Sequence, residues 1–193
     1  VGGGWYFPGQ THDDLRQEMR KYLDDGYRMV KMKIGGLSMA EDISRIETVL
    51  NVVNGGQYLA VDATCGLDRT RALAYAEALK PFALRWYEEP CDPMDFELYR
   101  ELTEVYPHAL AMGENLSGER ELQNFLRYSK FRPELDIIQV DPPLSYGILE
   151  YAKMMQLGKN LGFNASSFFP HGGNLMCLHV VAGLGAAACE AYT

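Results

Sequence analysis

The chain has 193 residues, a formal net charge of −8, and hydrophobic and charged fractions of 47% and 23%, which are ordinary values for a soluble globular domain. An acidic chain whose only basic cluster is one lysine pair argues against nucleic-acid binding. No apolar run approaches the roughly 20 residues that a helix needs to cross a bilayer, so the composition also argues against a membrane protein.

The first predicted elements are a short strand and a helix. Residues 1–7 (VGGGWYF) are apolar and aromatic after the glycines and end at Pro8-Gly9, which is typical of a strand followed by a turn. Thr11 is the expected N-cap of a helix that ends at Gly26. The apolar residues of this helix fall at helical spacing: Leu15, Met19, Tyr22 and Leu23.

The next predicted strand, residues 27–34, carries two lysines one residue apart. Successive side chains of a strand point to opposite faces, so Lys31 and Lys33 share one face while Val30 and Met32 share the other. Two ammonium groups this close make it harder for each other to stay charged, and a lysine with a lowered pKa is suited to act as a general base. The alternative is a solvated edge strand whose lysines prevent aggregation.

Helices and strands alternate through the rest of the chain. Ser38 and Glu41 have the spacing of a capping box, and Asp68 and Ser117 are the expected N-caps of two later helices. The helices are predicted from apolar residues at helical spacing: Ile43, Ile46, Val49, Leu50 and Val53; Leu73, Ala76 and Leu79, ending at Pro81; Phe96, Tyr99, Leu102 and Val105; Leu122, Phe125 and Leu126; Ile148, Ala152 and Met155 within 147–158; and the apolar run 174–188. Further strands are predicted over residues 58–62, 84–88, 109–114, 137–141 and 163–170, and a last one begins at residue 189.

Every predicted strand from the second onward leads to an ionisable residue at its carboxyl end. These residues are Lys33, Asp62, Glu88, Glu114, Asp141, His171 and Glu190, at intervals of 29, 26, 26, 27, 30 and 19 positions. The first five intervals fit one strand, one helix and two loops. The alternation predicts a parallel sheet, and eight strands favour a closed (β/α)8 barrel with its active site at the carboxyl ends of the strands. The alternative, an open doubly wound sheet, concentrates its chemistry at one switch point.

Three of the strand-end residues are carboxylates on consecutive strands. Asp62, Glu88 and Glu114 are 26 residues apart each time, so in a barrel they converge at one level of the rim. Three carboxylates that close cannot all stay ionised without a cation, and a hard, oxygen-preferring ion such as Mg²⁺ suits them. The alternative for each is a helix cap or a salt-bridge partner. For Glu89, which points to the opposite face, an outer salt bridge is the preferred interpretation.

A histidine and a carboxylate end the following two strands. Asp141 is placed to hold the ring of His171 and raise its pKa, which makes the pair an acid–base dyad. The lysines of the second strand and His171 then flank whatever the metal binds. The remaining histidines are expected to be structural: His12, His108 and His179.

This ordered set closely resembles the mandelate racemase subgroup of the enolase superfamily over essentially the whole chain: Lys31-x-Lys33, Asp62, Glu88-Glu89-Pro90, Gly113-Glu114-Asn115, Asp141, His171 and Glu190. The resemblance implies that Lys33 is the base, with its pKa lowered by Lys31. It implies that Mg²⁺ is bound by three carboxylates: Asp62, Glu88 and Glu114. It further implies that His171, supported by Asp141, is the second acid–base group and that Glu190 lies near the substrate carboxylate. One departure is Thr64, where many relatives place Asn, and this leaves the substrate open.

The same resemblance implies a Mg²⁺-dependent dehydratase, a carbon–oxygen lyase, acting on a small hydroxy acid or acid sugar. Lys33 removes the proton α to a carboxylate, the β-hydroxyl leaves as water, and a 2-keto acid forms. A racemase or epimerase of a 2-hydroxy acid would use the same residues. A Mg²⁺-binding barrel without turnover is the alternative from a different class.

The resemblance also bears on the extent of the protein. A full barrel has about 250 residues, so residues 1–193 are expected to be a partial barrel, truncated in its first and last strands. Relatives carry an N-terminal α+β capping domain, which is absent from this chain, and they are commonly homo-oligomers. The four cysteines lack CxxC spacing and are expected to be reduced thiols in a cytoplasmic protein.

Overall fold

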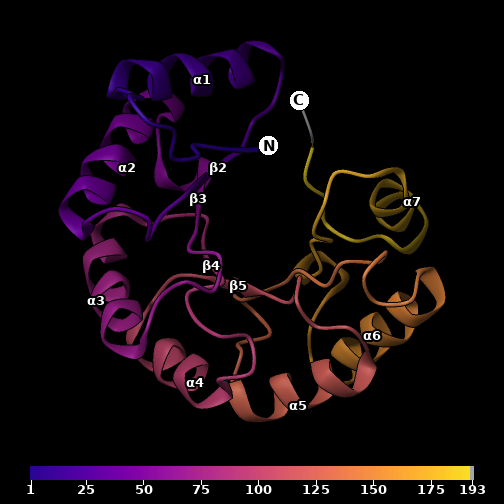
Figure 1. Ribbon diagram of the computed structural model, residues 1–193. Helices are drawn as coiled ribbons and strands as arrows, with labels where there is room; N and C mark the ends of the chain where they lie inside the picture. Colours follow the sequence, from indigo (N-terminus) through magenta and orange to yellow (C-terminus); the bar gives the residue numbers. More distant parts are fainter. Residues whose placement is uncertain (192–193) are drawn as a thin grey trace. The chain divides into compact units, whose positions relative to one another are not determined.

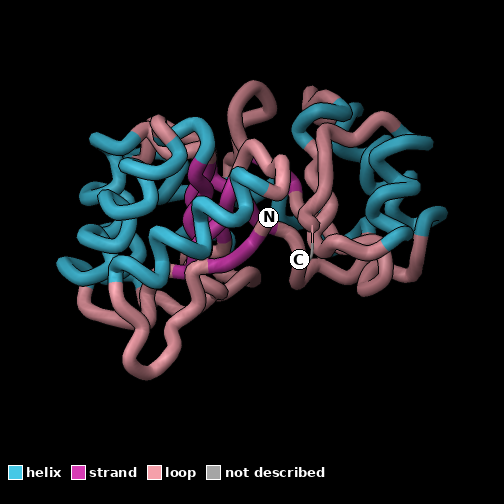
Figure 2. The backbone as a smooth tube through the Cα atoms, turned by 90° about the horizontal axis from the view of Figure 1, so that it is seen from above, coloured by secondary structure: helices cyan, strands magenta, loops and turns pink. Residues whose placement is uncertain are grey.

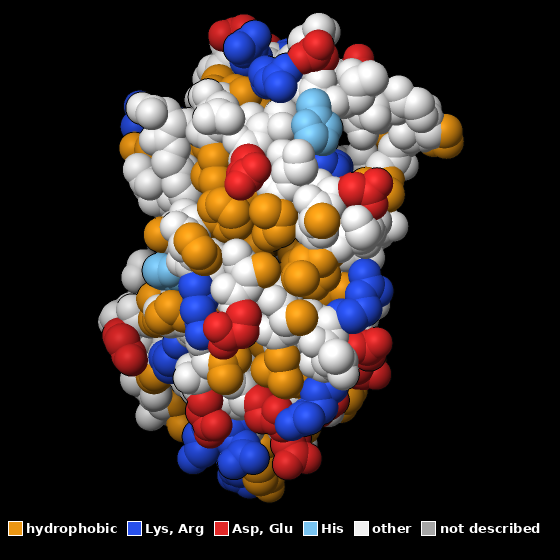
Figure 3. Space-filling view, turned by 90° about the vertical axis from the view of Figure 1, so that its left-hand side faces the viewer, with side chains coloured by type: hydrophobic (Ala, Val, Ile, Leu, Met, Phe, Trp, Pro, Cys, Tyr) orange, Lys and Arg blue, Asp and Glu red, His pale blue; other side chains and the backbone are white. Residues whose placement is uncertain are grey.

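The computed structural model describes residues 1–191 as two compact units (Figure 1). The first unit consists of Val1–Asp92 with Val105–Ala109, and the second of Pro93–Glu104 with the chain from Leu110 onward. Strands alternate with helices over residues 2–160, as the sequence predicts, but a 3₁₀ turn replaces the strand expected between the last two described helices. None of the described helices has the length and apolarity needed to span a membrane. On the face seen in Figure 3, Lys and Arg side chains lie among Asp and Glu side chains.

The first unit is built from parallel strands that are covered by helices (Figure 2). Its strands are β1 (Gly2–Gly3), β2 (Val30–Lys33), β3 (Leu59–Asp62) and β4 (Trp86–Glu88), each paired in parallel with the next. Its helices are α1 (His12–Asp24), α2 (Met39–Val53) and α3 (Arg69–Leu79). Short 3₁₀ turns at Gly56–Tyr58 and Lys80–Phe82 lead into β3 and β4.

The register of this sheet aligns the strand ends. Lys33 is the register partner of Asp62, and Asp62 is the register partner of Glu88. Paired residues of neighbouring parallel strands point to the same face, so these three side chains emerge together where β2, β3 and β4 end. Val30 and Met32, on the opposite face of β2, are fully buried. The predicted alternation of the lysine strand is therefore confirmed.

The second unit holds the remaining elements. Strands β5 (Leu110–Met112) and β6 (Ile137–Ile138) pair in parallel. The helices are α4 (Phe96–Val105), α5 (Glu119–Ser129), α6 (Ile148–Asn160) and α7 (Leu175–Leu184). Aromatic rings fill the space between α4 and α5: Phe125 packs edge-to-face on Tyr99 and on Phe131, with ring centroids 5.1 and 4.7 Å apart.

Helix capping follows the sequence closely. Thr11 and Ser38 form capping boxes at the starts of α1 and α2, and Asp68 and Asn174 cap α3 and α7 through their side chains. At α5 the prediction is wrong by one residue, because Gly118 is the N-cap. The Ser117 hydroxyl and backbone N donate instead to the carboxylate of Glu121, at 3.0 and 2.7 Å.

Replacing Asp68 by Ala is expected to lower the free energy of unfolding by about 1 kcal/mol. The Asp68 carboxylate accepts the Arg71 backbone N–H at 2.9 Å, and Ala leaves that donor at the start of α3 without a side-chain acceptor. Urea unfolding measures the difference. Asp68→Ser, which keeps an oxygen acceptor, is the matched control. An equal loss in both variants would show that the cap does not stabilise α3.

Two predicted strands are wrong, and the others are shorter than predicted. Residues 165–167 form a 3₁₀ turn, and Phe168 makes a single bridge to Ile138. The Phe168 backbone N donates to Ala165 O at 3.1 Å within this turn, so it does not join a ladder. Residues 189–191 are not in a strand, and residues 192–193 lie outside the described part of the chain.

The buried faces of two helices and the end of a third also differ from prediction. Ile148 is 43% exposed, and Tyr151 and Met154 are buried in its place beside the predicted Met155. In α3 the buried residues include Tyr75, while Leu73 is only half-buried. Helix α7 ends at Leu184 rather than residue 188, because Gly185 adopts a left-handed φ of +74° there.

Candidate active site

The carboxyl ends of β2, β3 and β4 bring two lysines and two carboxylates together in the first unit. Lys33 Nζ donates a hydrogen bond to Asp62 Oδ2, and Lys31 Nζ donates one to Glu88 Oε1. Lys31 Nζ also lies 3.6 Å from Asp62 Oδ2. The Lys31, Asp62 and Glu88 side chains are 8%, 2% and 0% exposed. Burial on this scale weakens solvent screening, so the charges interact more strongly than surface charges would.

Each carboxylate has a further donor that fixes its orientation. Asp62 Oδ1 accepts the Thr64 backbone N–H at 2.8 Å, and Glu88 Oε2 accepts the Trp86 indole N–H at 2.7 Å. Burial by itself raises the pKa of Asp62, but the charges of Lys31 and Lys33 outweigh it and hold that pKa below its usual value. Asp62 is therefore an ionised carboxylate in a fixed position.

The donor set of the first unit suits a hard divalent cation. Asp62 and Glu88 offer oriented carboxylate oxygens in neighbouring strands, which is the ligand type such ions prefer. Lys31 contacts both carboxylates, so a cation bound by them must compete with its ammonium group. The third predicted ligand, Glu114, belongs to the second unit. Within residues 1–191, no three His, Cys, Asp or Glu side chains gather as a metal site, so the three-ligand set stays a prediction.

Glu89 lies elsewhere than predicted. It is fully buried and has a positive φ of 41°, and Cys65 contacts it twice. The Cys65 thiol donates to Glu89 Oε2, and the Cys65 backbone N donates to the Glu89 carbonyl at 2.7 Å. The chain leaves the extended conformation at Glu89, so strand alternation no longer assigns its face. The expected outward-facing position of Glu89 is therefore wrong, because the residue is fully buried.

The second unit places an imidazole among three carboxylates. His171 Nδ1 lies 2.8 Å from Asp141 Oδ2, while Nε2 lies 3.4 Å from Glu114 Oε2 and 3.7 Å from Glu190 Oε2. The Glu190 carboxylate also accepts the Gly172 backbone N–H at 2.9 Å. The predicted contact between Asp141 and His171 is present.

The surroundings of His171 define what its ring can do. Asp141 is buried, and its other oxygen accepts the Leu144 backbone N–H at 3.1 Å, which fixes the carboxylate against Nδ1. An anionic carboxylate at Nδ1 requires that nitrogen to carry the proton. Nε2 is then the nitrogen left to exchange a proton with a ligand, and the His171 side chain as a whole is 26% exposed. The assigned acid–base role stays a prediction.

The other histidines contact structural groups. His12 Nδ1 lies 3.1 Å from the Thr48 hydroxyl, and His108 Nε2 lies 3.0 Å from the Lys80 carbonyl. His179 is exposed on α7. These contacts agree with the structural interpretation of His12 and His108.

Three residues near Lys33 were missed by the sequence analysis. The Trp5 ring lies over the Lys33 ammonium, and Asp42 and Arg45 are buried at the start of α2. Trp5 comes just after β1, in the same place relative to its strand as the ionisable residues have relative to later strands. That position could have marked it as a candidate site residue. Asp42 and Arg45 lie on the same side of α2 as buried Ile46, where a charged pair is unusual.

The chain is similar in sequence and structure to several known proteins. Residues 14–193 match the family model described as enolase C-terminal domain-like. The chain is 28% identical over 194 residues to arabinonate dehydratase from Saccharolobus solfataricus, and 29% identical over 164 residues to L-talarate/galactarate dehydratase from Salmonella typhimurium. The crystal structure of L-talarate dehydratase from Polaromonas sp. JS666, complexed with Mg and L-glucarate, is similar with a TM-score of 0.84 and 26% identity.

These matches cover most of this chain but only about half of each relative. The two curated dehydratases align with 100% and 83% of this chain, but the chain spans only 51% and 40% of their lengths. It covers 51% of the L-talarate dehydratase chain, while 99% of this chain is matched.

Proposed function

Because the chain belongs to the enolase C-terminal domain-like family, we propose that it forms the catalytic part of a Mg²⁺-dependent acid-sugar dehydratase. Family membership confirms the fold class predicted from the sequence. The observation that carries the proposal is the register of Lys33 with Asp62 and Glu88, which puts the proposed base beside two oriented carboxylates. Dehydratases among its relatives support the choice of reaction.

The proposed metal ligands are Asp62, Glu88 and Glu114. Bound Mg²⁺ supplies positive charge that stabilises the negative charge developing on the substrate carboxylate. Asp62 and Glu88 fit this role because the Thr64 and Trp86 donors hold them in place. Glu190 is proposed to lie near the same carboxylate.

Lys33 and His171 are the proposed proton-transfer groups. Lys33 Nζ, as the neutral amine, takes the proton from the carbon α to the carboxylate. The electron pair of that C–H bond forms the new double bond, and the C–O bond at the β-carbon breaks. His171 Nε2 gives its proton to the departing hydroxyl, which leaves as water. The resulting enol becomes a 2-keto acid. The proton comes from His171 in its imidazolium form, which the Asp141 carboxylate beside Nδ1 stabilises.

D-Tartrate heads the proposed substrates. Five motifs of the chain most resemble D-tartrate dehydratase: WYEE-x-x-DP-x-D at residues 86–95, GENL at 113–116, LSYG at 144–147, PHGGN at 170–174 and VAGLG at 181–185. Arabinonate, galactarate and L-talarate join the panel because relatives act on these acids by name. We include in the proposal a capping domain outside residues 1–193 and a homo-oligomeric state for the full protein.

A proton NMR time course in D₂O tests this function with the full-length protein, Mg²⁺ and these acids. The expected result for one acid is loss of the α-proton signal together with appearance of a 2-keto acid. Chelation of Mg²⁺ with EDTA should stop both changes. Deuterium exchange at the α-carbon without loss of water, for every acid, would favour a racemase or epimerase instead. No change with any acid would leave the ligand-binding barrel as the better interpretation.

A further inference from the structure

The Trp5 ring contacts the ammonium group of Lys33, which also pairs with Asp62. The ring centroid lies 4.6 Å from Lys33 Nζ, which is within the range of a cation–π contact. Trp5 is the second residue after β1, and it is 51% exposed, although large aromatic residues usually bury their rings. The exposure of the Trp5 ring therefore needs an explanation, and its contact with the partly buried Lys33 ammonium group offers one.

The backbone of both residues is tied to one buried guanidinium. Arg45 donates from one nitrogen to the Lys33 carbonyl at 3.0 Å and from another to the Gly4 carbonyl at 2.6 Å. Gly4 directly precedes Trp5. The rigid fork of a guanidinium sets the spacing of two acceptors, which a flexible side chain would not do. Arg45 therefore fixes the ends of β1 and β2 relative to each other.

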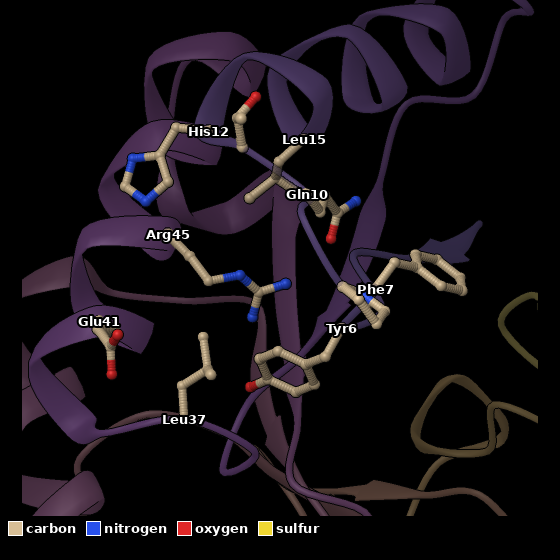
Figure 4. A pocket seen from close by; sticks show the side chains of 10 residues that line it. Tyr6, Phe7, Gln10, His12, Leu15, Leu37, Glu41 and Arg45 are labelled. Atoms are coloured by element: carbon tan, nitrogen blue, oxygen red, sulfur yellow. The ribbon is translucent and has the colours of Figure 1, made fainter.

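Arg45 is itself held in place by packing and charge. Its guanidinium carbon lies 4.2 Å from the centroid of the Tyr6 ring, and Figure 4 shows the two side chains together. The Tyr6 hydroxyl donates to Asp42 Oδ1 at 2.7 Å. The other oxygen of Asp42 accepts from the Gly35 backbone N at 2.6 Å and from the Tyr75 hydroxyl at 2.7 Å. All of these groups support the two short segments that carry Trp5 and Lys33.

We propose that Trp5 is a positioning residue for the Lys33 ammonium group, held in register by the Arg45 guanidinium. Lys33 Nζ contacts the Asp62 carboxylate, which attracts it toward β3, and the Trp5 ring, which lies after β1. The ring limits the directions that the nitrogen can sample. The inference rests on the base role proposed for Lys33.

The kinetic test compares Trp5→Leu with Trp5→Phe in the full-length protein with Mg²⁺. Misplacement of a reacting group by about 1 Å costs up to about 10²-fold in rate, so we expect Trp5→Leu to lower kcat for α-proton exchange by about 10- to 100-fold. KM and Mg²⁺ affinity should stay unchanged. Trp5→Phe, which keeps an aromatic face, should restore much of the rate.

Phe7→Leu is the matched control, because Phe7 is an exposed aromatic residue of the same segment at 63% exposure. It should keep the kcat of the unchanged protein. A normal kcat in Trp5→Leu would overturn the proposal, and so would a loss that appears in KM alone, since that result would make Trp5 a substrate contact.

A second measurement needs no turnover. Trp5 and Trp86 are the two tryptophans of the chain, so subtracting the emission of Trp5→Phe from that of the unchanged protein isolates Trp5. Removing the nearby charge with Lys33→Met should shift this emission, and Phe7→Leu should not. Unchanged Trp5 emission in Lys33→Met would overturn the proposal. If Lys33→Met shifts the Trp5 emission but no acid loses its α-proton, the proposed function is wrong while the contact between Trp5 and Lys33 is supported.

Discussion

Replacing Lys33 by Ala is expected to lower kcat for dehydration by about 10²- to 10⁴-fold, the usual contribution of a positioned general base. The substitution removes the amine to which the proposed function assigns the α-proton. Mg²⁺ binding should survive, because the oxygens of Asp62 and Glu88 keep their Thr64 and Trp86 donors. The NMR time course measures turnover, and isothermal titration calorimetry measures Mg²⁺ affinity in the same variant.

Two companion variants make this result specific. Lys21→Ala removes an exposed lysine that pairs with Asp25 on α1, and it should keep full activity. His171→Asn should block loss of water but still allow α-deuterium exchange, because Lys33 remains. Rapid dehydration by Lys33→Ala would show that another group is the base. If His171→Asn dehydrates normally, the acid role assigned to His171 is wrong.

The predicted parts of the site follow from local rules. Parallel pairing and the two-residue period of a strand were enough to align Lys33, Asp62 and Glu88, because all three lie at the ends of regular strands. Helix caps at Thr11, Ser38 and Asp68 were predicted because capping depends on residues three positions apart.

The unpredicted parts depend on contacts between distant residues or on irregular backbone. Asp42 and Arg45 are buried because Tyr6, Tyr75 and the Gly4 carbonyl bind them, and these partners lie about 30 to 40 positions away in the chain. Local periodicity does not contain that information. Asp42 breaks the apolar pattern of its helix, yet it organises the loop that follows β2.

Irregular backbone explains the remaining errors. Glu89 was assigned a face by strand alternation, but its positive φ ends the alternation at that residue. Residues 163–170 are rich in aromatic side chains and were predicted as a strand. In the structure the 3₁₀ turn uses their backbone donors locally, and Phe168 packs against Gly158, where an added Cβ would lie 2.5 Å from the ring. The pattern of apolar residues in the sequence does not predict that Phe168 packs closely against Gly158.

Lys31→Met is expected to destabilise the Mg²⁺-free protein by about 3–5 kcal/mol, the range found when one partner of a buried ion pair is removed. Counted as whole residues, Lys31 is 7% exposed, and Asp62 and Glu88 are 1% and 0% exposed. Met retains the apolar volume of the side chain but leaves Glu88 without its ammonium partner. Lys33 continues to offset the charge of Asp62. The destabilisation therefore comes mainly from the buried charge of Glu88.

The same variant should respond more strongly to Mg²⁺ than the unchanged protein does. A ligand that binds the folded state stabilises it in proportion to the logarithm of its concentration over Kd. In Lys31→Met the cation no longer competes with an ammonium group for the Asp62 and Glu88 oxygens, so Mg²⁺ should recover most of the lost stability. Thermal unfolding in EDTA and in Mg²⁺ measures this, with Lys21→Met as the exposed control. If Mg²⁺ raises the midpoints of Lys31→Met and the unchanged protein equally, Lys31 is not compensating the carboxylates that bind the metal. A larger Mg²⁺-dependent rise of the unfolding midpoint in Lys31→Met would show that the Lys31 ammonium group balances the charge of the Asp62 and Glu88 carboxylates when Mg²⁺ is absent. This result would not depend on any effect of Lys31 on Lys33.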